Sequence, residues 1–326
     1  MKRSILIILA AVALAAGCGP RSGRSTDPAA KAADMRDFPT VKTPDVYSEN
    51  KDRQRFLAEH FWDRFFSERE GMVCDSFTVY GVPTPVLEEA FSGYVAVLQS
   101  IDIATAKEDI GAFFDRIESA QREDIGSNVY EVFGLLMDRY LYDPNSPFRN
   151  EDLYQPYVEK LSKSKLTSPD MAPAFANEAR LCALNPIGSP AADFRFTDSN
   201  GVTRRLHDVN ALHTLLLFSN PGCTACEDLV KSIKSIRNID RKISMGRLAI
   251  VNVYIDDDLN AWRQHLPGFP RNWYNGYDTD HVIRRDLIYN IRGIPSLYIL
   301  DKDKRVVMKD APEENVLRFL DSIRAE

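Results

Sequence analysis

The 326-residue sequence has no excess of basic charge and only five histidines. Its 41 lysines and arginines are outnumbered by 47 aspartates and glutamates, which gives a net charge of −6. Nucleic acid is therefore not an expected partner, because phosphate backbones are bound by basic faces. The five histidines show no ligand spacing to a cysteine pair, so we expect neither a metal nor another cofactor.

Cysteine is also scarce, and its count of five is odd. Cys223 and Cys226 form a Cys-x-x-Cys motif, and Cys18 follows an apolar N-terminal run. Cys74 and Cys182 remain. In an exported protein they could form a structural disulfide, and the alternative is two buried free thiols. The spacing does not decide between these possibilities.

The first long apolar run, residues 5–16, contains only twelve residues, too few to span a bilayer as a mature helix. It follows Lys2 and Arg3, so residues 1–17 indicate a secretion signal. The segment ends Leu-Ala-Ala-Gly-Cys18, which resembles a bacterial lipobox. This resemblance implies that Cys18 becomes the lipidated first residue. The alternative is ordinary cleavage nearby, with Cys18 incidental.

A lipid on Cys18 would anchor the protein to a membrane of the cell envelope. Gly19 argues against retention in the inner membrane, by the rule for such lipoproteins. We therefore expect a periplasm-facing protein, at the inner leaflet of the outer membrane more than at the inner membrane. Residues 18–44 are rich in Gly, Pro, Ser and Ala, and are predicted to form a flexible tether.

Residues 45–183 are predicted to form a separate all-α domain, because apolar residues recur at spacings of three and four. The stretch 140–154 differs, since prolines interrupt it and Asn150 is placed to cap a following helix. It could be a recognition loop or a packed connector. With the Phe61-Trp62-Asp63 segment, it resembles an uncharacterised helical domain found ahead of thioredoxin folds in envelope lipoproteins. That resemblance implies no activity.

Residues 184–326 are predicted to be α/β. A hairpin is expected over 194–206, with strands at 213–219, 248–255, 294–300 and 305–308. Helices are expected after the cysteine pair, at 259–266, at 281–289 and near the C-terminus. Strand–helix alternation with a terminal hairpin and helix indicates a mixed sheet.

The Cys-x-x-Cys motif lies where a buried strand turns into a helix. Unpaired N–H groups at a helix start favour the thiolate, which is the attacking species in disulfide exchange. Half of a zinc site would need two further ligands from elsewhere in the chain.

The segment Asn-Ile-Arg-Gly-Ile294-Pro295-Ser resembles the thioredoxin loop in which a cis proline packs beside the active cysteines. Residues 187–194 and the Asn200-Gly201 turn are similar to the TlpA-type branch of that superfamily. The resemblance implies a thioredoxin-like fold over residues 184–326. It also implies a cis Pro295, and an Ile294 backbone that binds an extended substrate.

By the same resemblance Cys223 is the exposed nucleophile and Cys226 the buried resolving cysteine. The sequence departs from the family between the cysteines, where Thr224-Ala225 lacks the usual Pro or His, and at Gly222, where thioredoxins usually carry Trp. Leu217 and Leu229 also replace acids, the buried Asp of thioredoxin and the Glu of membrane-bound reductases. The expected function is an envelope-tethered thiol–disulfide oxidoreductase that reduces protein or peptide disulfides and is reset by an envelope electron donor. The alternative is a non-catalytic binding or scaffold lipoprotein with a thioredoxin fold.

Overall fold

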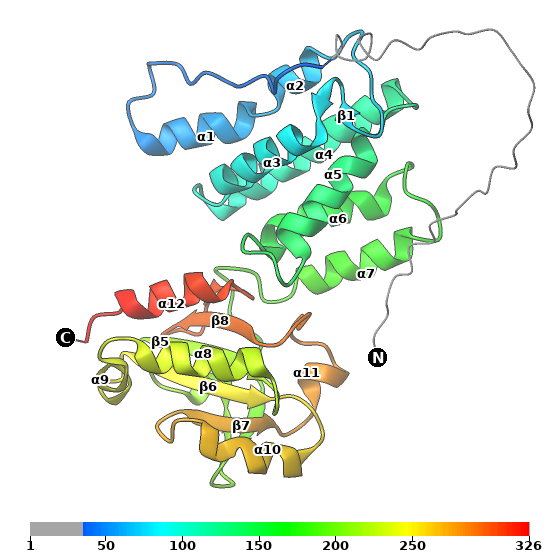
Figure 1. The fold of residues 1–326 in the computed structure, drawn as a ribbon. Coiled ribbons are helices and arrows are strands. Elements are labelled where there is room, and N and C mark those ends of the chain that lie inside the picture. Colours follow the sequence, from blue (N-terminus) through cyan, green and yellow to red (C-terminus); the bar gives the residue numbers. More distant parts are fainter. Residues whose placement is uncertain (1–34, 326) are drawn as a thin grey trace, which may run out of the picture.

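The computed structural model describes residues 35–325, which form a helical part followed by an α/β part (Figure 1). The predicted signal segment, Cys18 and the first residues of the predicted tether lie outside the described residues, so those expectations remain predictions. Among residues 35–325, no helix is long and apolar enough to cross a membrane.

The helical part is organised around an aromatic core. Trp62, Phe91, Phe113 and Phe133 are all buried in it, with ring centroids 5.0–6.4 Å from the Trp62 ring. Its elements are α1 (Asn50–His60), α2 (Asp63–Ser67), β1 (Thr78–Val79), β2 (Val82–Pro83), α3 (Thr84–Leu98), α4 (Ile103–Glu123), α5 (Val129–Met137), the π-helix η3 (Asp138–Tyr142), α6 (Glu151–Lys163) and α7 (Ala172–Cys182).

The helical fold expected for this part is confirmed, and β1 and β2 add one antiparallel hairpin with two residues in each strand. One expectation needs correction, because the tether ends earlier than residue 44. The Phe38 ring lies 5.4 Å from the Trp62 ring and 5.7 Å from the Phe61 ring, and Arg36 donates to the carbonyls of Phe65, Glu68 and Tyr80.

The α/β part contains a seven-stranded mixed sheet of order β4-β3-β7-β6-β5-β8-β9. Strands β5, β6 and β7 are mutually parallel, and β8 runs antiparallel to β5. The elements are β3 (Arg195–Asp198), β4 (Thr203–Arg205), η4 (Leu206–Asp208), β5 (His213–Ser219), α8 (Thr224–Ser235), α9 (Ile239–Ser244), β6 (Leu248–Tyr254), α10 (Leu259–His265), η5 (Leu266–Gly268), β7 (Tyr274–Asp278), α11 (Val282–Arg285), β8 (Ser296–Asp301), β9 (Val306–Met308) and α12 (Glu313–Ser322).

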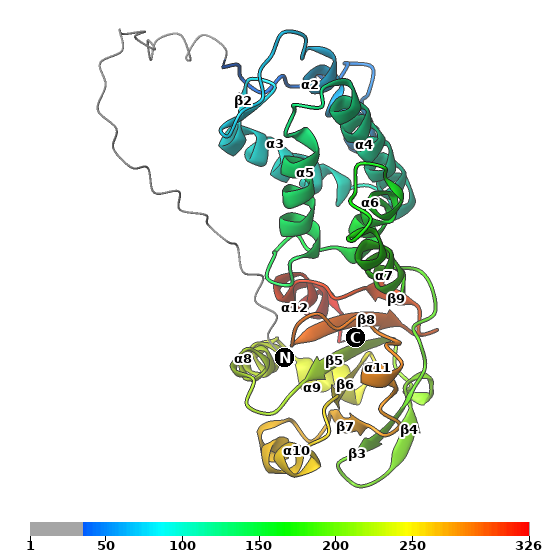
Figure 2. The same cartoon turned by 90° about the vertical axis from the view of Figure 1, so that its right-hand side faces the viewer.

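Alternate residues of the central strands pack into two hydrophobic clusters, one on each face of the sheet. Leu215 and Leu217 of β5 pack with α8 and α12, whereas Leu216 and Phe218 face the cluster that includes Tyr289. Figure 2 shows α8 and α12 on one side of the sheet and α11 on the other. This two-sided burial explains why β5 and β6 are continuous apolar runs.

Three elements of this part differ from expectation. Strand β7 and helix α9 were not predicted, and α11 is shorter than residues 281–289. Tyr274–Asp278 contains Asn275, Gly276 and a terminal Asp, residue types depleted in strands. The pairing of β7 with both β6 and β3 overrides that preference.

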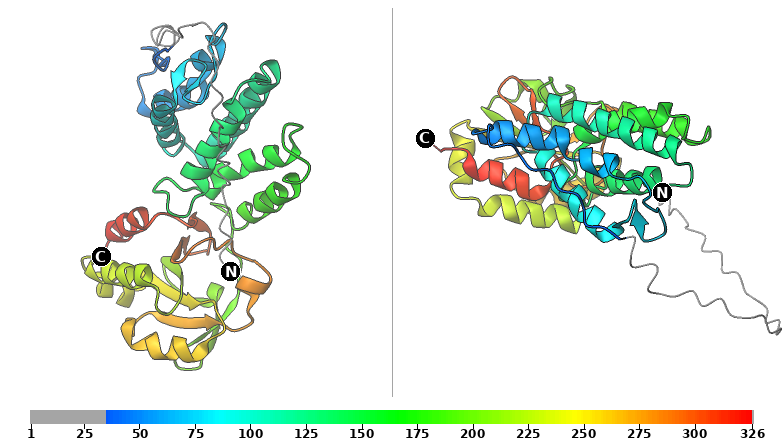
Figure 3. Two further views of the ribbon diagram at one scale, coloured as in Figure 1. Left: turned by 45° about the vertical axis from the view of Figure 1, so that its right-hand side comes forward. Right: turned by 90° about the horizontal axis from the view of Figure 1, so that it is seen from above.

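The helical part stands over the edge of the sheet near β9 and α12 (Figures 1 and 3). The link is polar as well as covalent: the Arg149 side chain donates to the carbonyls of Asp310 and Ala311, and the Ile187 N–H donates to Asp152. The stretch 140–154 therefore packs against the α/β part, as expected for a connector.

Candidate active site

The cysteine pair sits at the junction of β5 and α8. A turn over residues 220–222 connects them, with the Cys223 N–H donating to the Asn220 carbonyl at 3.3 Å. Gly222 has φ +73°, a left-handed conformation that glycine adopts without steric cost. Cys223 is the N-cap of α8, and its sulfur accepts a hydrogen bond from the Cys226 N–H at 3.1 Å. The turn thus aims the first sulfur at the unpaired N–H groups of a helix start.

The two cysteines are joined in a disulfide, with their Cα atoms 5.2 Å apart. Cys226 is 1% exposed, whereas Cys223 is half-buried. An incoming nucleophile or substrate therefore reaches Cys223 and not Cys226, which is the order of access that the sequence predicts. Glu227 and Asp228 are exposed beside the pair, and Asp228 is bonded to Lys231 at 2.9 Å.

The loop ahead of β8 faces the cysteines. The Ile294–Pro295 peptide bond is cis, which confirms the configuration implied by the resemblance. The Ile294 carbonyl oxygen lies 3.9 Å from Cys223 Sγ. The structure thereby brings together Cys223, Cys226, Ile294 and Pro295.

The interior behind Cys226 is apolar. Leu217 and Leu229 are both fully buried in the cluster under α8. No carboxylate therefore replaces the buried acid at either of these two positions. Cys226 lines a cavity of about 400 Å³ that also contains Glu227, Lys231, Lys234, His265 and Phe269. Within residues 35–325, no group of three or more His, Cys, Asp or Glu side chains is placed to hold a metal.

A second set of residues, which the sequence did not reveal, lies directly behind the cis-proline loop. We call it the interface charge cluster: Arg149, Glu151, Asp152, Arg292, Lys309 and Asp310. Glu151 at the start of α6 is 1% exposed and accepts hydrogen bonds from Arg292 Nε and Asn290 Nδ2, both at 2.7 Å. Lys309 Nζ lies 3.2 Å from Asp152, and Arg292 reaches Asp310 at 2.8 Å. The cluster contains three acids and three bases, drawn from both parts of the chain.

The interface charge cluster fixes both flanks of the cis-proline loop. Arg292 precedes the cis bond, and Ser296, which follows it, donates to Asp310 at 2.8 Å. The Arg292 guanidinium also lies over the Tyr142 ring, 4.4 Å from its centroid. A Cβ on Gly293 would lie only 3.3 Å from Pro144. The helical part therefore contacts the loop that would bind substrate.

The two remaining cysteines are not bridged, which corrects the disulfide considered for them. Cys182 is the last residue of α7 and is fully buried. Its backbone carbonyl accepts a hydrogen bond from Lys309 Nζ. Cys74 lies beside Ser127 and accepts from the Tyr80 N–H. Each thiol thus has a different set of neighbours.

Comparison with known proteins agrees with this geometry. A family model described as thioredoxin-like matches residues 213–306, and a model of a domain of unknown function, DUF5106, matches residues 17–173. The crystal structure of a thioredoxin-like protein from Bacteroides caccae ATCC 43185 is 31% identical, with a TM-score of 0.74. The match covers 88% of this chain and 98% of that chain. The chain belongs to the thioredoxin-like proteins.

Two further relatives each match less than half of this thioredoxin-like protein. The thiol-disulfide oxidoreductase ResA of Geobacillus kaustophilus (strain HTA426) is 26% identical over 145 residues, which is 42% of this chain and 78% of that protein. The C-terminal domain of an uncharacterized protein from Bacteroides fragilis NCTC 9343 is 37% identical, covers 42% of this chain and 97% of that chain, and has a TM-score of 0.40. At family level, the similarity to ResA and the cysteine pair support a redox function for the thioredoxin-like protein.

Proposed function

We propose that this thioredoxin-like protein is an envelope-tethered thiol–disulfide oxidoreductase that reduces protein or peptide disulfides. The observation that carries the proposal is the half-buried Cys223 sulfur. It accepts a helix-start N–H and lies 3.9 Å from the Ile294 carbonyl. When the pair is reduced, this position stabilises a Cys223 thiolate, because the helix start presents unpaired N–H groups and a partial positive charge.

The reaction proceeds in two exchanges. The Cys223 thiolate attacks one sulfur of the substrate disulfide, the substrate S–S bond breaks, and the leaving thiolate takes a proton from solvent. A mixed disulfide then joins Cys223 to the substrate. The Cys226 thiol loses its proton and attacks Cys223 Sγ, which releases the second substrate thiolate and leaves the Cys223–Cys226 disulfide. Two electrons have passed to the substrate, and a dithiol donor of the envelope must return them.

The substrate segment would lie between Cys223 and the cis-proline loop. The Ile294 backbone can pair with an extended chain in the manner of an added strand. Pro144 of the helical part lies against Gly293, so the helical part borders the loop that would bind the substrate.

Location is proposed on the sequence. The apolar N-terminal run and the lipobox-like segment support lipidation of Cys18 and placement in the cell envelope, facing the periplasm. The inner leaflet of the outer membrane is favoured over the inner membrane. Palmitate labelling of the expressed full-length protein, with Cys18→Ala as the control, tests this. Labelling that is equal in both proteins would contradict it.

One observation favours the scaffold alternative. Leu217 and Leu229 leave no acid at either position that assists the second cysteine in relatives. Reduction of insulin with dithiothreitol as donor separates the two functions. We expect turnover by the wild type and none by Cys223→Ser. Absence of turnover by the folded wild type would favour the scaffold.

The direction of electron flow follows from the reduction potential of the 223–226 couple. A value near −270 mV is that of a reductase, and a value near −120 mV is that of a strong oxidant. We expect the first, and equilibration with glutathione buffers measures it.

A further inference from the structure

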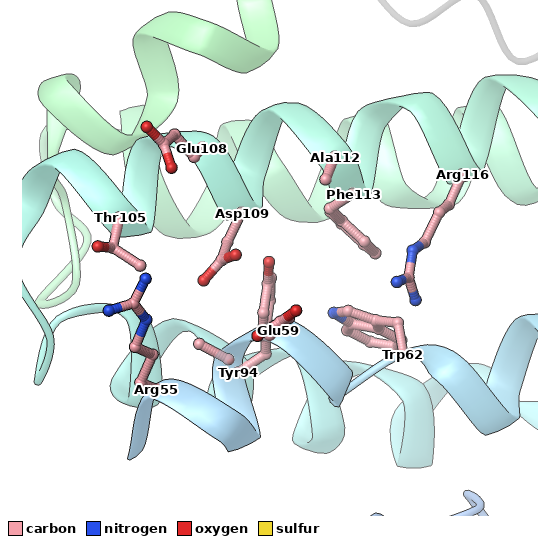
Figure 4. Close-up of a pocket in the computed structure, with 11 residues that line it drawn as sticks. Arg55, Glu59, Trp62, Tyr94, Thr105, Glu108, Asp109, Ala112, Phe113 and Arg116 are labelled. Atoms are coloured by element: carbon pink, nitrogen blue, oxygen red, sulfur yellow. The ribbon is translucent and has the colours of Figure 1, made fainter. Parts of the chain in front are cut away.

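The helical part contains a cavity of about 350 Å³ that the redox chemistry does not use. It opens between α1 and α4, with aromatic side chains as its floor (Figure 4). Trp62, Tyr94 and Phe113 supply that floor, and all three are buried. Polar side chains from both helices surround it.

Two buried polar atoms at this cavity have no partner. Trp62 is 2% exposed, and its indole Nε1 makes no hydrogen bond; the Asp109 Oδ2 atom is likewise buried and unpaired. Figure 4 shows both groups directed into the space between α1 and α4. A buried donor or acceptor without a partner costs about 1–3 kcal/mol. A ligand that accepts from the indole and donates to the carboxylate would recover that cost.

The charges around the cavity indicate a cation. Glu59, Glu108 and Asp109 line it, and none of the three forms a salt bridge with any residue in the described part of the chain. Two arginines, Arg55 and Arg116, face these three carboxylates, and Arg116 is also paired with Asp63. Burial, reinforced by Glu59, raises the pKa of Asp109 to about 6. Binding of a positively charged ligand would therefore stabilise the ionised form of the Asp109 carboxylate.

We propose that this cavity binds a small amine that also carries a hydrogen-bond-accepting oxygen, the chemistry of an amino alcohol. Its ammonium group faces Asp109 and Glu59, and its oxygen accepts the Trp62 indole N–H. The faces of the aromatic floor add cation–π attraction. This site does not involve the cysteine pair, so a test of ligand binding here does not depend on the proposed redox activity.

Ethanolamine is the probe, because it is the smallest molecule with both groups. Calorimetric titration of the full chain at pH 7.5 is expected to show saturable binding. Ethylamine, which lacks the oxygen, and ethanol, which lacks the charge, are expected to bind at least about tenfold more weakly. Absence of ethanolamine binding up to about 10 mM would mean that the cavity holds only water, and would overturn the proposal.

Two substitutions locate the site. Asp109→Asn removes the charge while keeping the shape, and Trp62→Phe removes the N–H while keeping an aromatic ring; each is expected to weaken ethanolamine binding at least about tenfold. Glu131→Gln, an exposed change of the same charge on α5, is the matched control and should bind as the wild type does. Equal affinity in Asp109→Asn and wild type would overturn the proposal.

A measurement on the wild type covers the case in which a variant does not fold. Ethanolamine keeps its charge between pH 7.5 and 5, whereas Asp109 takes up a proton through its pKa of about 6. The charged groups that face Asp109 are Arg55 and Glu59 of α1 and Glu108 and Arg116 of α4, with Tyr94 of α3 beside them. We expect affinity to fall about tenfold over this range. Affinity that does not change with pH would refute a role for the Asp109 carboxylate.

Discussion

Arg292 donates through Nε to the Glu151 carboxylate at 2.7 Å, and this buried contact joins the helical part to the residue two positions before the cis peptide bond. The relationship gives the helical part a physical role in the proposed chemistry. It holds the loop that would receive substrate, rather than acting only as a spacer.

Arg292→Lys should weaken substrate binding. The guanidinium reaches Glu151 and Asp310 at the same time, and a single ammonium group cannot satisfy both acids. We expect the KM for a disulfide substrate to rise about tenfold, close to 1.4 kcal/mol, with little change in kcat. Arg318→Lys, an exposed change on α12, is the control and should leave both constants unchanged. A fall in kcat with unchanged KM would contradict the positioning role.

Glu151 should make stability depend on pH. Burial raises its pKa to about 7, against the opposing effect of Lys309 and Arg292. The folded state therefore keeps a proton that the unfolded state loses above its ordinary pKa. Between about pH 4.5 and 7 the free energy of unfolding should fall as pH rises, by about 3 kcal/mol at most. Urea titrations of the wild type and Glu151→Gln measure the difference, and parallel pH profiles would disprove the effect.

The two free thiols should react at different rates. Burial raises the pKa of the Cys182 thiol, and Cys182 is fully buried, whereas Cys74 is only half-buried. With the 223–226 disulfide intact, iodoacetamide at about pH 8 should modify Cys74 first and Cys182 only after unfolding. Mass spectrometry of the native and urea-treated protein reads this out. Equal labelling of both in the native protein would be inconsistent with the described burial.

The second exchange should be slow at neutral pH. Leucines occupy the two positions at which the resemblance to thioredoxins and membrane-bound reductases would place an acid near Cys226. The rate of a single turnover by the pre-reduced protein should therefore increase with pH between about 6 and 8.5, because solvent must take up the Cys226 proton before the second exchange. Stopped-flow kinetics without added donor gives the profile. A rate that is constant over this range would mean that another group accepts the proton.

Phe38→Ala should destabilise the helical part, because the Phe38 ring packs against Phe61, Trp62 and Phe65. A partly buried ring of this kind should contribute about 2 kcal/mol to the free energy of unfolding. Val46→Ala is the matched control, since Val46 is 80% exposed and should change stability by less than about 0.5 kcal/mol. Equal effects of the two substitutions would mean that Phe38 belongs to the flexible tether, as the sequence predicts.

Local patterns were sufficient for most of the fold and for the cysteine pair. Apolar periodicity indicated the helices, and continuous apolar runs indicated β5 and β6, because each pattern reflects the face that an element buries. The packing of Phe38 into the helical core could not be predicted in this way, because a single aromatic residue in a stretch that contains Pro and Ala forms no periodic pattern. The interface charge cluster escaped it as well. Glu151 and Arg292 are 141 residues apart, and no local pattern indicates that two such charges meet in the interior.

Gly222 has a consequence for access to the nucleophile. Its backbone adopts φ +73°, and a Cβ built there would meet nothing within 4 Å. The position is thus empty yet closed to most residues by conformation, since other L-residues pay about 1–2 kcal/mol for the left-handed region. The tryptophan that the resemblance would place at this position would therefore take up the left-handed conformation at that cost. Glycine leaves the residue before the Cys223 nucleophile without a side chain, so this position adds no side-chain contact to a partner that approaches the sulfur.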